Sequence, residues 1–199
     1  MALTESTMMK LGSDLPAFEL PDFDGQQVGS AQFAGQPLLV MFICNHCPYV
    51  KHVAEELSRL GRDYADREIG IVAIQSNNVD EYPDDSPEKM KQEAADRGYS
   101  FPYLFDETQK VALAFTAACT PDLFLFDGDH KLAYRGRLDE TRPTRIKSGV
   151  YDSSGHESDG KEIRAAIDAV LSGGKPADQQ LPAMGCNIKW KPGNEPDYY

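Results

Sequence analysis

Short apolar runs alternate with amphipathic stretches along most of this 199-residue chain. Apolar runs bounded by turn formers predict buried strands at Pro37–Ile43, Gly70–Gln75, Tyr103–Phe105 and Leu123–Phe126. An Asp-Gly turn after the last of these predicts a hairpin with Leu132–Arg135. Apolar residues at helical spacing predict helices at about 45–66, 86–97, 109–115 and 161–171. The order β-α-β-α-β-β-α predicts an α/β fold whose mixed central sheet is flanked by helices.

The two ends of the chain lack long periodic segments. Residues 11–36 alternate apolar residues with turn formers, which predicts a short hairpin or an extended segment. Residues 148–160 predict a polar loop, and residues 175–199 hold four prolines and show no periodicity. We expect one domain at 1–174 and an extended C-terminal tail at 175–199 that packs on it, since a lone Trp usually needs burial.

The composition narrows the classes of partner. A formal net charge of −12 makes phosphate backbones and anionic membrane surfaces poor partners. The first ten residues lack the basic and apolar regions of a secretory leader, and no window approaches the roughly 18 apolar residues of a membrane span. Four scattered cysteines are too few for a disulfide-stapled secreted scaffold. We therefore expect a cytoplasmic protein that binds neither nucleic acid nor membranes.

Candidate chemistry is concentrated at Cys44-Asn45-His46-Cys47, between the first predicted core strand and its helix. Thiols at this spacing can close a small disulfide, and unpaired N–H groups at the start of a helix stabilise a thiolate. We expect Cys44, at the exposed end of the strand, to be the nucleophile, and Cys47, one turn deeper, to resolve a mixed disulfide. A protonated His46 would lower the pKa of Cys44 further. The pattern predicts redox catalysis or metal binding.

This order of elements, with C-x-x-C between strand and helix, resembles the thioredoxin-like redoxin family, in its alkyl hydroperoxide reductase/thiol-specific antioxidant branch. Thr120-Pro121, just before the fourth strand, is similar to the family's Thr-Pro, and the resemblance implies that Pro121 is cis and lies against both sulfurs. Arg135-Gly-Arg-Leu-Asp139 is also similar to a redoxin pattern. The resemblance covers about residues 10–172 and implies a thioredoxin-like fold.

A more specific likeness is to one bacterial subgroup of this family, which shares the string Cys-Asn-His-Cys-Pro-Tyr-Val at 44–50 and the ending at 185–191. The resemblance implies a thiol–disulfide oxidoreductase without a cofactor, acting on a protein or small-molecule disulfide or thiol. It does not identify the electron donor or the oligomeric state. One departure weakens the likeness to general reductases, because thioredoxins place a buried carboxylate in the strand that here is the apolar Leu38–Phe42.

A thiol-dependent peroxidase with an antioxidant role is the alternative enzyme. Peroxiredoxins place Thr or Ser three positions before the peroxidatic cysteine, but Met41 stands three before Cys44. An arginine must also polarise the peroxide, and Arg135 or Arg137 could supply that guanidinium. More often such arginines pair with surface acids.

A metal-binding or chaperone-like module using the same thiols is the third alternative. Copper-delivery relatives of this fold use C-x-x-x-C and a distant His, whereas the spacing here is one residue shorter. His46, His52 and His130 are available, but a tetrahedral zinc site would need two further ligands near the pair. We expect no metal at this site.

Three features outside the motif leave alternatives open. Cys119 is interpreted as a small buried hydrophobe beside Pro121, while a sharper hypothesis has the tail bring Cys186 to Cys119 or to the C-x-x-C for a second exchange step. The loop at 76–85 either shapes a substrate groove or is an acidic solvated loop, and we favour the latter. Glu55 and Glu56 are expected to be solvated helix residues.

Overall fold

The computed structural model describes residues 3–155 and 157–198. Its central sheet has the strand order β6-β5-β4-β8-β9. The parallel strands are β4 (Leu38–Phe42), β5 (Gly70–Gln75) and β6 (Tyr103–Phe105). The antiparallel hairpin of β8 (Asp122–Phe126) and β9 (Leu132–Gly136) continues the sheet beyond β4. The predicted α/β fold with a mixed sheet is therefore confirmed.

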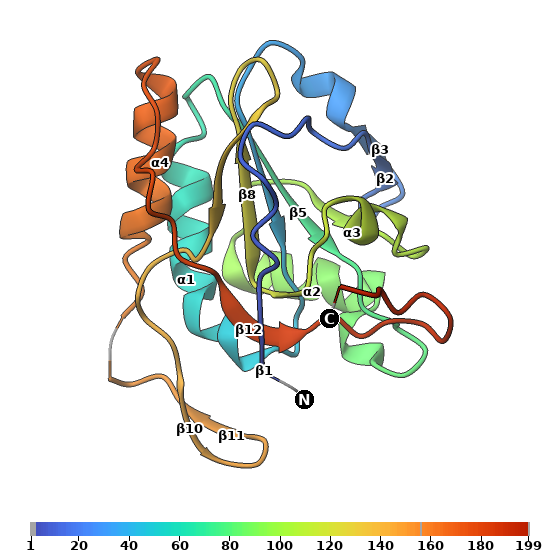
Figure 1. Ribbon diagram of the computed structural model, residues 1–199. Coiled ribbons are helices and arrows are strands. Elements are labelled where there is room, and N and C mark those ends of the chain that lie inside the picture. The colour runs from blue at the N-terminus through green and yellow to red at the C-terminus, as the bar shows by residue number, and fades with distance from the viewer. Residues whose placement is uncertain (1–2, 156, 199) are drawn as a thin grey trace.

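Helices cover both faces of this sheet (Figure 1). On one face lie α1 (Pro48–Asp63) and α4 (Lys161–Leu171), and on the other lies α3 (Lys110–Ala114). The fourth, α2 (Pro87–Arg97), contacts α1 and the edge strand β6, and ends at a left-handed Gly98, which favours glycine. Within the described ranges, no helix is long and apolar enough to cross a bilayer.

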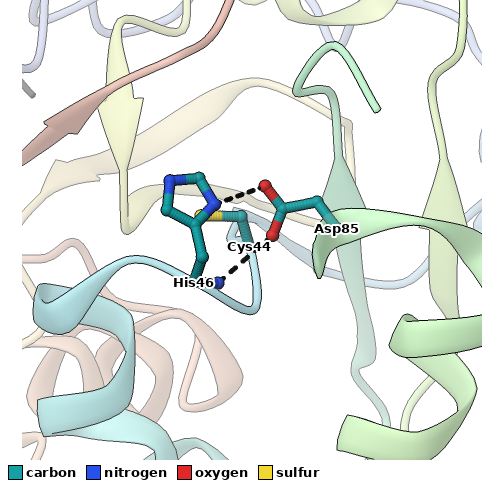
Figure 2. Close-up of side chains that lie close together, drawn as sticks. All are labelled: Cys44, His46 and Asp85. Carbon is teal, nitrogen blue, oxygen red and sulfur yellow. Dashed lines mark hydrogen bonds and ion pairs between the residues drawn. The ribbon is translucent and has the colours of Figure 1, made fainter. Parts of the chain in front are cut away.

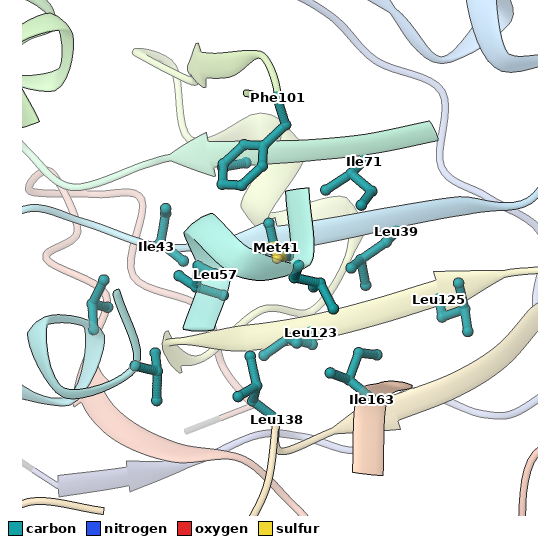
Figure 3. Packing of buried hydrophobic residues seen from close by; sticks show 14 of the residues in the cluster. Leu39, Met41, Ile43, Leu57, Ile71, Phe101, Leu123, Leu125, Leu138 and Ile163 are labelled. Atoms are coloured by element: carbon teal, nitrogen blue, oxygen red, sulfur yellow. The ribbon is translucent and has the colours of Figure 1, made fainter. Parts of the chain in front are cut away.

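Alternation along β4 divides the core into two layers. Leu39 and Met41 pack with α1 and α4, as Figure 3 shows around Leu57 and Ile163. Leu38, Val40 and Phe42, which alternate with them along β4, point to the opposite face. There they pack with Phe115 and neighbouring rings. Because β4 is buried on both faces, its sequence is a continuous apolar run rather than an alternating one.

Short hairpins and turns complete the periphery. β2 (Glu19–Pro21) and β3 (Gln27–Gly29) confirm the hairpin predicted within 11–36, and a 3-10 helix, Ser30–Phe33, follows. A second hairpin, β10 (Thr144–Lys147) with β11 (Val150–Asp152), was not predicted. Its strands are mostly exposed and polar, so they carry no apolar period to detect.

The two ends of the described chain meet in a separate three-stranded sheet. Its order is β1 (Leu3–Glu5), β12 (Met184–Asn187) and β7 (Cys119–Thr120). β1 and β12 lie side by side (Figure 1). β12 pairs antiparallel with both neighbours, which places Cys186 opposite Thr120. Tail residues thus lie directly against the Thr-Pro segment.

Glu56 corrects one expectation about α1. Its side chain is 2% exposed and accepts hydrogen bonds from Arg59 and Arg164, whereas the neighbouring Glu55 is 84% exposed. The prediction of a solvated residue is therefore right for Glu55 and wrong for Glu56. A buried carboxylate held by two guanidiniums ties α1 to α4.

Candidate active site

Cys44 and Cys47, the cysteine pair, lie where β4 passes into α1. Cys47 is the residue that precedes the first turn of α1, with Pro48 at its first position. The two thiols lie close enough for each to shift the pKa of the other. Cys44 Sγ lies 3.3 Å from Thr120 Oγ1, and the Cys47 thiol donates to the Thr120 carbonyl at 3.2 Å. The Thr120-Pro121 peptide is cis, as the family resemblance implied.

Both sulfurs are enclosed. Cys44 is 1% exposed and Cys47 is fully buried, so the expectation that Cys44 lies at an exposed strand end is wrong. Burial follows from two segments: the loop after β5 lies beside Cys44, and β12, in the tail that one hypothesis brought to the pair, lies beside Cys47. Any molecule that reacts with either sulfur therefore needs one of these segments to move.

Asp85 is the functional residue that sequence reasoning missed. It ends the 3-10 helix Pro83–Asp85 and is fully buried, which contradicts the interpretation of this loop as solvated. Its Oδ1 accepts the backbone N–H groups of Asn45 at 2.9 Å and His46 at 3.2 Å. Its Oδ2 lies 2.6 Å from His46 Nδ1 (Figure 2). The same oxygen accepts the Asn77 side-chain amide at 2.8 Å. A signal existed: Asp85 comes just before a helix N-cap, on a loop at the carboxyl end of β5.

The position of Asp85 changes the electrostatics of Cys44. The N–H groups expected to stabilise a Cys44 thiolate are instead bound to the Asp85 carboxylate. Burial first, then the hydrogen bond with Cys47 and the charge of Asp85, raise the pKa of Cys44 well above its usual range. The expectation of a lowered pKa at Cys44 is therefore wrong.

Cys47 has the lowered pKa in this arrangement. Burial alone would raise its pKa, but hydrogen bonds from the thiols of Cys186 and Cys44, from Thr120 and from the Val50 backbone lower it. The same contact with Cys47 raises the pKa of Cys186. Cys47 is thus the central sulfur of a three-thiol cluster, with two neighbouring thiols as donors.

Tyr82 stacks on the His46 ring, and Lys189 lies in turn over the Tyr82 ring. The Tyr82 ring lies 5.3 Å from the His46 ring at an interplanar angle of 17°. The Lys189 ammonium lies 5.6 Å from the centre of the same tyrosine ring. The Lys189 backbone also binds Asn77 and Asn78, so the tail fixes the loop that carries Asp85.

The remaining predicted residues occupy different places. Cys119 is buried in β7, and its thiol points toward the carbonyl oxygens of Pro121 and Ala183, which agrees with its interpretation as a buried hydrophobe. Arg135 binds the Met9 carbonyl and Gln180, and Arg137 forms a bidentate pair with Glu162. Because both guanidiniums are bound to these partners, neither is placed to polarise a peroxide at Cys44.

One set of side chains could ligate a metal. Among the described residues, Cys44, His46 and Asp85 offer donor atoms within 4.8 Å of one another. His52 binds Thr141 and His130 binds the Phe33 carbonyl, so neither adds a fourth ligand for a tetrahedral site. The His46–Asp85 hydrogen bond already joins two of the three groups, and this favours the metal-free arrangement.

A cavity of about 430 Å³ opens beside the cis proline. Pro121, Tyr49 and Met184 line it, and the segment 137–143 forms much of its wall. Its lining combines apolar surface with charged groups, among them Glu5 and Arg142. It is large enough for several side chains of a bound peptide.

Replacing Gly185 by alanine is expected to loosen β12. An added Cβ would lie 2.0 Å from the Thr120 carbonyl oxygen, so β12 must move away from β7 at a cost of about 1–3 kcal/mol. Native-state labelling of Cys47 and Cys186 with iodoacetamide should then accelerate about tenfold. Gly155→Ala, whose Cβ meets nothing within 4 Å, is the control. Wild-type labelling rates in Gly185→Ala would contradict the tight approach.

Comparisons with known proteins agree with this geometry. The AhpC/TSA family profile matches residues 11–135, which include the cysteine pair and Pro121. A Mycobacterium tuberculosis (strain H37Rv) protein named "Putative peroxiredoxin Rv2521" is 30% identical over 115 residues, 58% of this chain and 69% of its own length. The thiol-disulfide oxidoreductase ResA of Geobacillus thermodenitrificans is 26% identical over 130 residues, 65% of this chain and 70% of its own length.

Solved structures extend the likeness. A conserved protein from Geobacillus kaustophilus is 48% identical, with a TM-score of 0.89, and the match covers 97% of this chain and 98% of that one. Solved structures named for thioredoxin or thiol–disulfide exchange, at 17–22% identity and TM-scores of 0.60–0.62, share the fold. With its buried C-x-x-C beside a cis Thr-Pro, the chain belongs to the AhpC/TSA family of thioredoxin-like redoxins.

Proposed function

We propose that this protein is a thiol–disulfide oxidoreductase that exchanges electrons through Cys44 and Cys47. The observation that supports this most is that both sulfurs contact Thr120, beside the cis proline, at 3.3 Å and 3.2 Å. Thiols in contact close into a disulfide with a small movement. The relatives named as a peroxiredoxin and a thiol–disulfide oxidoreductase agree with an oxidoreductase. The substrate is a disulfide of a protein or small molecule.

In this proposal Cys44 attacks and Cys47 receives its proton. The Cys44 sulfur bonds to one sulfur of the substrate disulfide, whose other sulfur leaves and takes the proton from Cys47. The Cys47 thiolate then attacks Cys44 Sγ, which closes the Cys44–Cys47 disulfide and releases the second substrate thiolate. The substrate gains two electrons and the cysteine pair loses two. Cys47 thereby replaces the strand carboxylate that Leu38–Phe42 lacks.

The surroundings fit this sequence of steps. The Thr120 hydroxyl, 3.3 Å from Cys44 Sγ, can donate to the sulfur as its proton leaves. The cavity beside Pro121 provides space for the substrate chain next to the pair. Displacing Met184, which lines that cavity and begins β12, would open a path to Cys47 and Cys44.

Reduction of insulin disulfides by dithiothreitol tests the proposal. We expect the wild-type protein to accelerate the reaction and Cys44→Ser to reduce it to the rate of dithiothreitol alone. Cys119→Ala is the matched control, because its buried thiol contacts only carbonyl groups, and should keep a rate close to wild type. Full insulin reduction by Cys44→Ser, or none by the wild type, would refute the proposal.

A peroxidase is the second candidate, and one observation favours it. The hydroxyl that the sequence lacked three positions before Cys44 is supplied by Thr120. The arginines are committed elsewhere, to Gln180 and Glu162, which is why we rank this activity second. Consumption of hydrogen peroxide with a thiol donor, without insulin reduction, would reverse the ranking.

A further inference from the structure

Cys186 is a buried thiol that the proposed two-cysteine reaction does not use. It lies in β12, 2% exposed, opposite Thr120, whose carbonyl oxygen is 3.2 Å from Cys47 Sγ. Two independent features hold it there. β12 is paired on both sides, with Leu3 opposite Cys186 in β1 and Thr120 opposite it in β7. Gly185, without a side chain, lets the backbone of β12 approach the Thr120 carbonyl.

Cys119 shows that burial near the site does not by itself create this contact. It is equally buried and lies next to Thr120 in the same strand, β7. Its thiol is directed to the carbonyls of Pro121 and Ala183, at 3.5 Å and 4.0 Å, rather than to another sulfur. Of the two additional cysteines, Cys186 is therefore the one positioned to react with the pair.

We propose that Cys186 is a third redox cysteine, and that Cys47 is the sulfur shared by two alternative disulfides, Cys44–Cys47 and Cys47–Cys186. This inference rests on the proposed function, which generates the first disulfide. Cys186 loses its proton and attacks Cys47 Sγ. The Cys47–Cys186 bond forms, the Cys44–Cys47 bond breaks, and Cys44 leaves as a thiolate that takes up the proton. No external oxidant or reductant is needed, because the step only relocates the disulfide.

As a consequence, the substrate and the reductant react at different sulfurs of the protein. Relocation of the disulfide leaves Cys44 as a thiol that can react with another substrate. The disulfide is then between Cys47, at the start of α1, and Cys186 in the tail. The sulfurs must close from contact to about 2 Å, a movement within reach of a short strand such as β12. A protein or small thiol that reduces the relocated disulfide then acts on the tail side of the molecule.

Disulfide mapping of Cys44→Ser tests the inference. The reduced variant is treated with oxidised glutathione, alkylated, digested and analysed by mass spectrometry. We expect Cys47 linked to Cys186 as the main product, with the same link in Cys44→Ser/Cys119→Ala. In Cys44→Ser/Cys186→Ala this link is lost, and Cys47 carries glutathione instead. A glutathione adduct alone, or a link from Cys47 to Cys119, in the single variant would overturn the proposal.

A time course on the wild-type protein provides the second measurement. After a pulse of oxidant, the Cys44–Cys47 peptide pair should appear first and the Cys47–Cys186 pair should grow at its expense. Persistence of Cys44–Cys47 as the sole disulfide at equilibrium would refute relocation. Insulin reduction by the same preparation is scored separately, so an inactive protein refutes the proposed function, while an active one without the Cys47–Cys186 link refutes only the role of Cys186.

Discussion

Replacing Asp122 by asparagine is expected to raise the free energy of unfolding by about 4 kcal/mol at pH 7. Asp122 begins β8, directly after Pro121, and is fully buried. Burial raises the pKa of this carboxyl to about 8, although backbone N–H groups of Ala118, Cys119 and Leu123 donate hydrogen bonds to it. Its Oδ1 has no partner within residues 3–155 and 157–198. The folded protein therefore holds a neutral carboxyl where the unfolded chain would ionise.

The sign of the pH dependence follows from this difference. Below about pH 4 both states are protonated at Asp122, and the site has no effect on stability. From about pH 4 to pH 8 only the folded state keeps the proton, so the wild type loses about 1.4 kcal/mol per pH unit relative to the variant. Above about pH 8 the difference is constant.

Urea unfolding of the reduced protein at several pH values measures this difference, with circular dichroism as the signal. Asp66→Asn, at an exposed position after α1, is the control and should show no pH-dependent gain. A difference between Asp122→Asn and the wild type that does not grow with pH would contradict a protonated Asp122 in the folded state.

The central strands and helices could be predicted from the sequence because each is indicated by residues within the element itself or next to it. Apolar runs identified β4 and β5, and the Ser86-Pro87 start and Gly98 end of α2 carry their own capping chemistry. The cysteine pair was found from its own spacing, and Pro121 was found from the resemblance to the family's Thr-Pro. Such features depend on residues adjacent in the chain.

The contacts that define the site could not be predicted because they join distant segments. Asp85 reaches Asn45 across 40 positions. The approach of Cys186 was a hypothesis, but the sequence could not decide whether the tail brings it to Cys119 or to the C-x-x-C. β12, with the sequence Met-Gly-Cys-Asn, has neither an apolar run nor strand-forming residues, and it forms because β1 and β7 pair with it on both sides. Likewise, the place of Asp85 before a helix N-cap marks the start of an element, but it does not show that the carboxylate is buried against backbone N–H groups.

Two replacements of Asp85 test its effect on the cysteine pair. One is expected to lower the stability of the fold, and the other is expected to lower the pKa of Cys44. Asp85→Ala removes the acceptor of four hydrogen bonds and leaves buried donors of Asn45, His46 and Asn77 unpaired. We expect a loss of about 3–5 kcal/mol in the free energy of unfolding, as when one partner of a buried charged pair is removed. Denaturant unfolding under reducing conditions gives this value.

Asp85→Asn isolates the effect of the charge. An amide keeps an oxygen for the two backbone N–H groups but has no negative charge, and the charge of Asp85 is one of the causes that raise the pKa of Cys44. The pKa of Cys44 should therefore fall, and Cys44 should be alkylated faster at neutral pH. Mass spectrometry of iodoacetamide-treated protein across a pH series, with the label assigned to each cysteine, measures the shift of the midpoint.

Asp84→Asn is the matched control for both effects. Its side chain is exposed, and only its backbone carbonyl takes part in the site, by accepting the Asn45 amide at 2.9 Å. It should leave both the stability and the Cys44 midpoint unchanged. An unchanged midpoint in Asp85→Asn would mean that the carboxylate does not suppress the Cys44 thiolate. A lowered midpoint, with faster insulin reduction per folded molecule, would show that Asp85 keeps the resting pair protonated at Cys44 until a substrate displaces the loop.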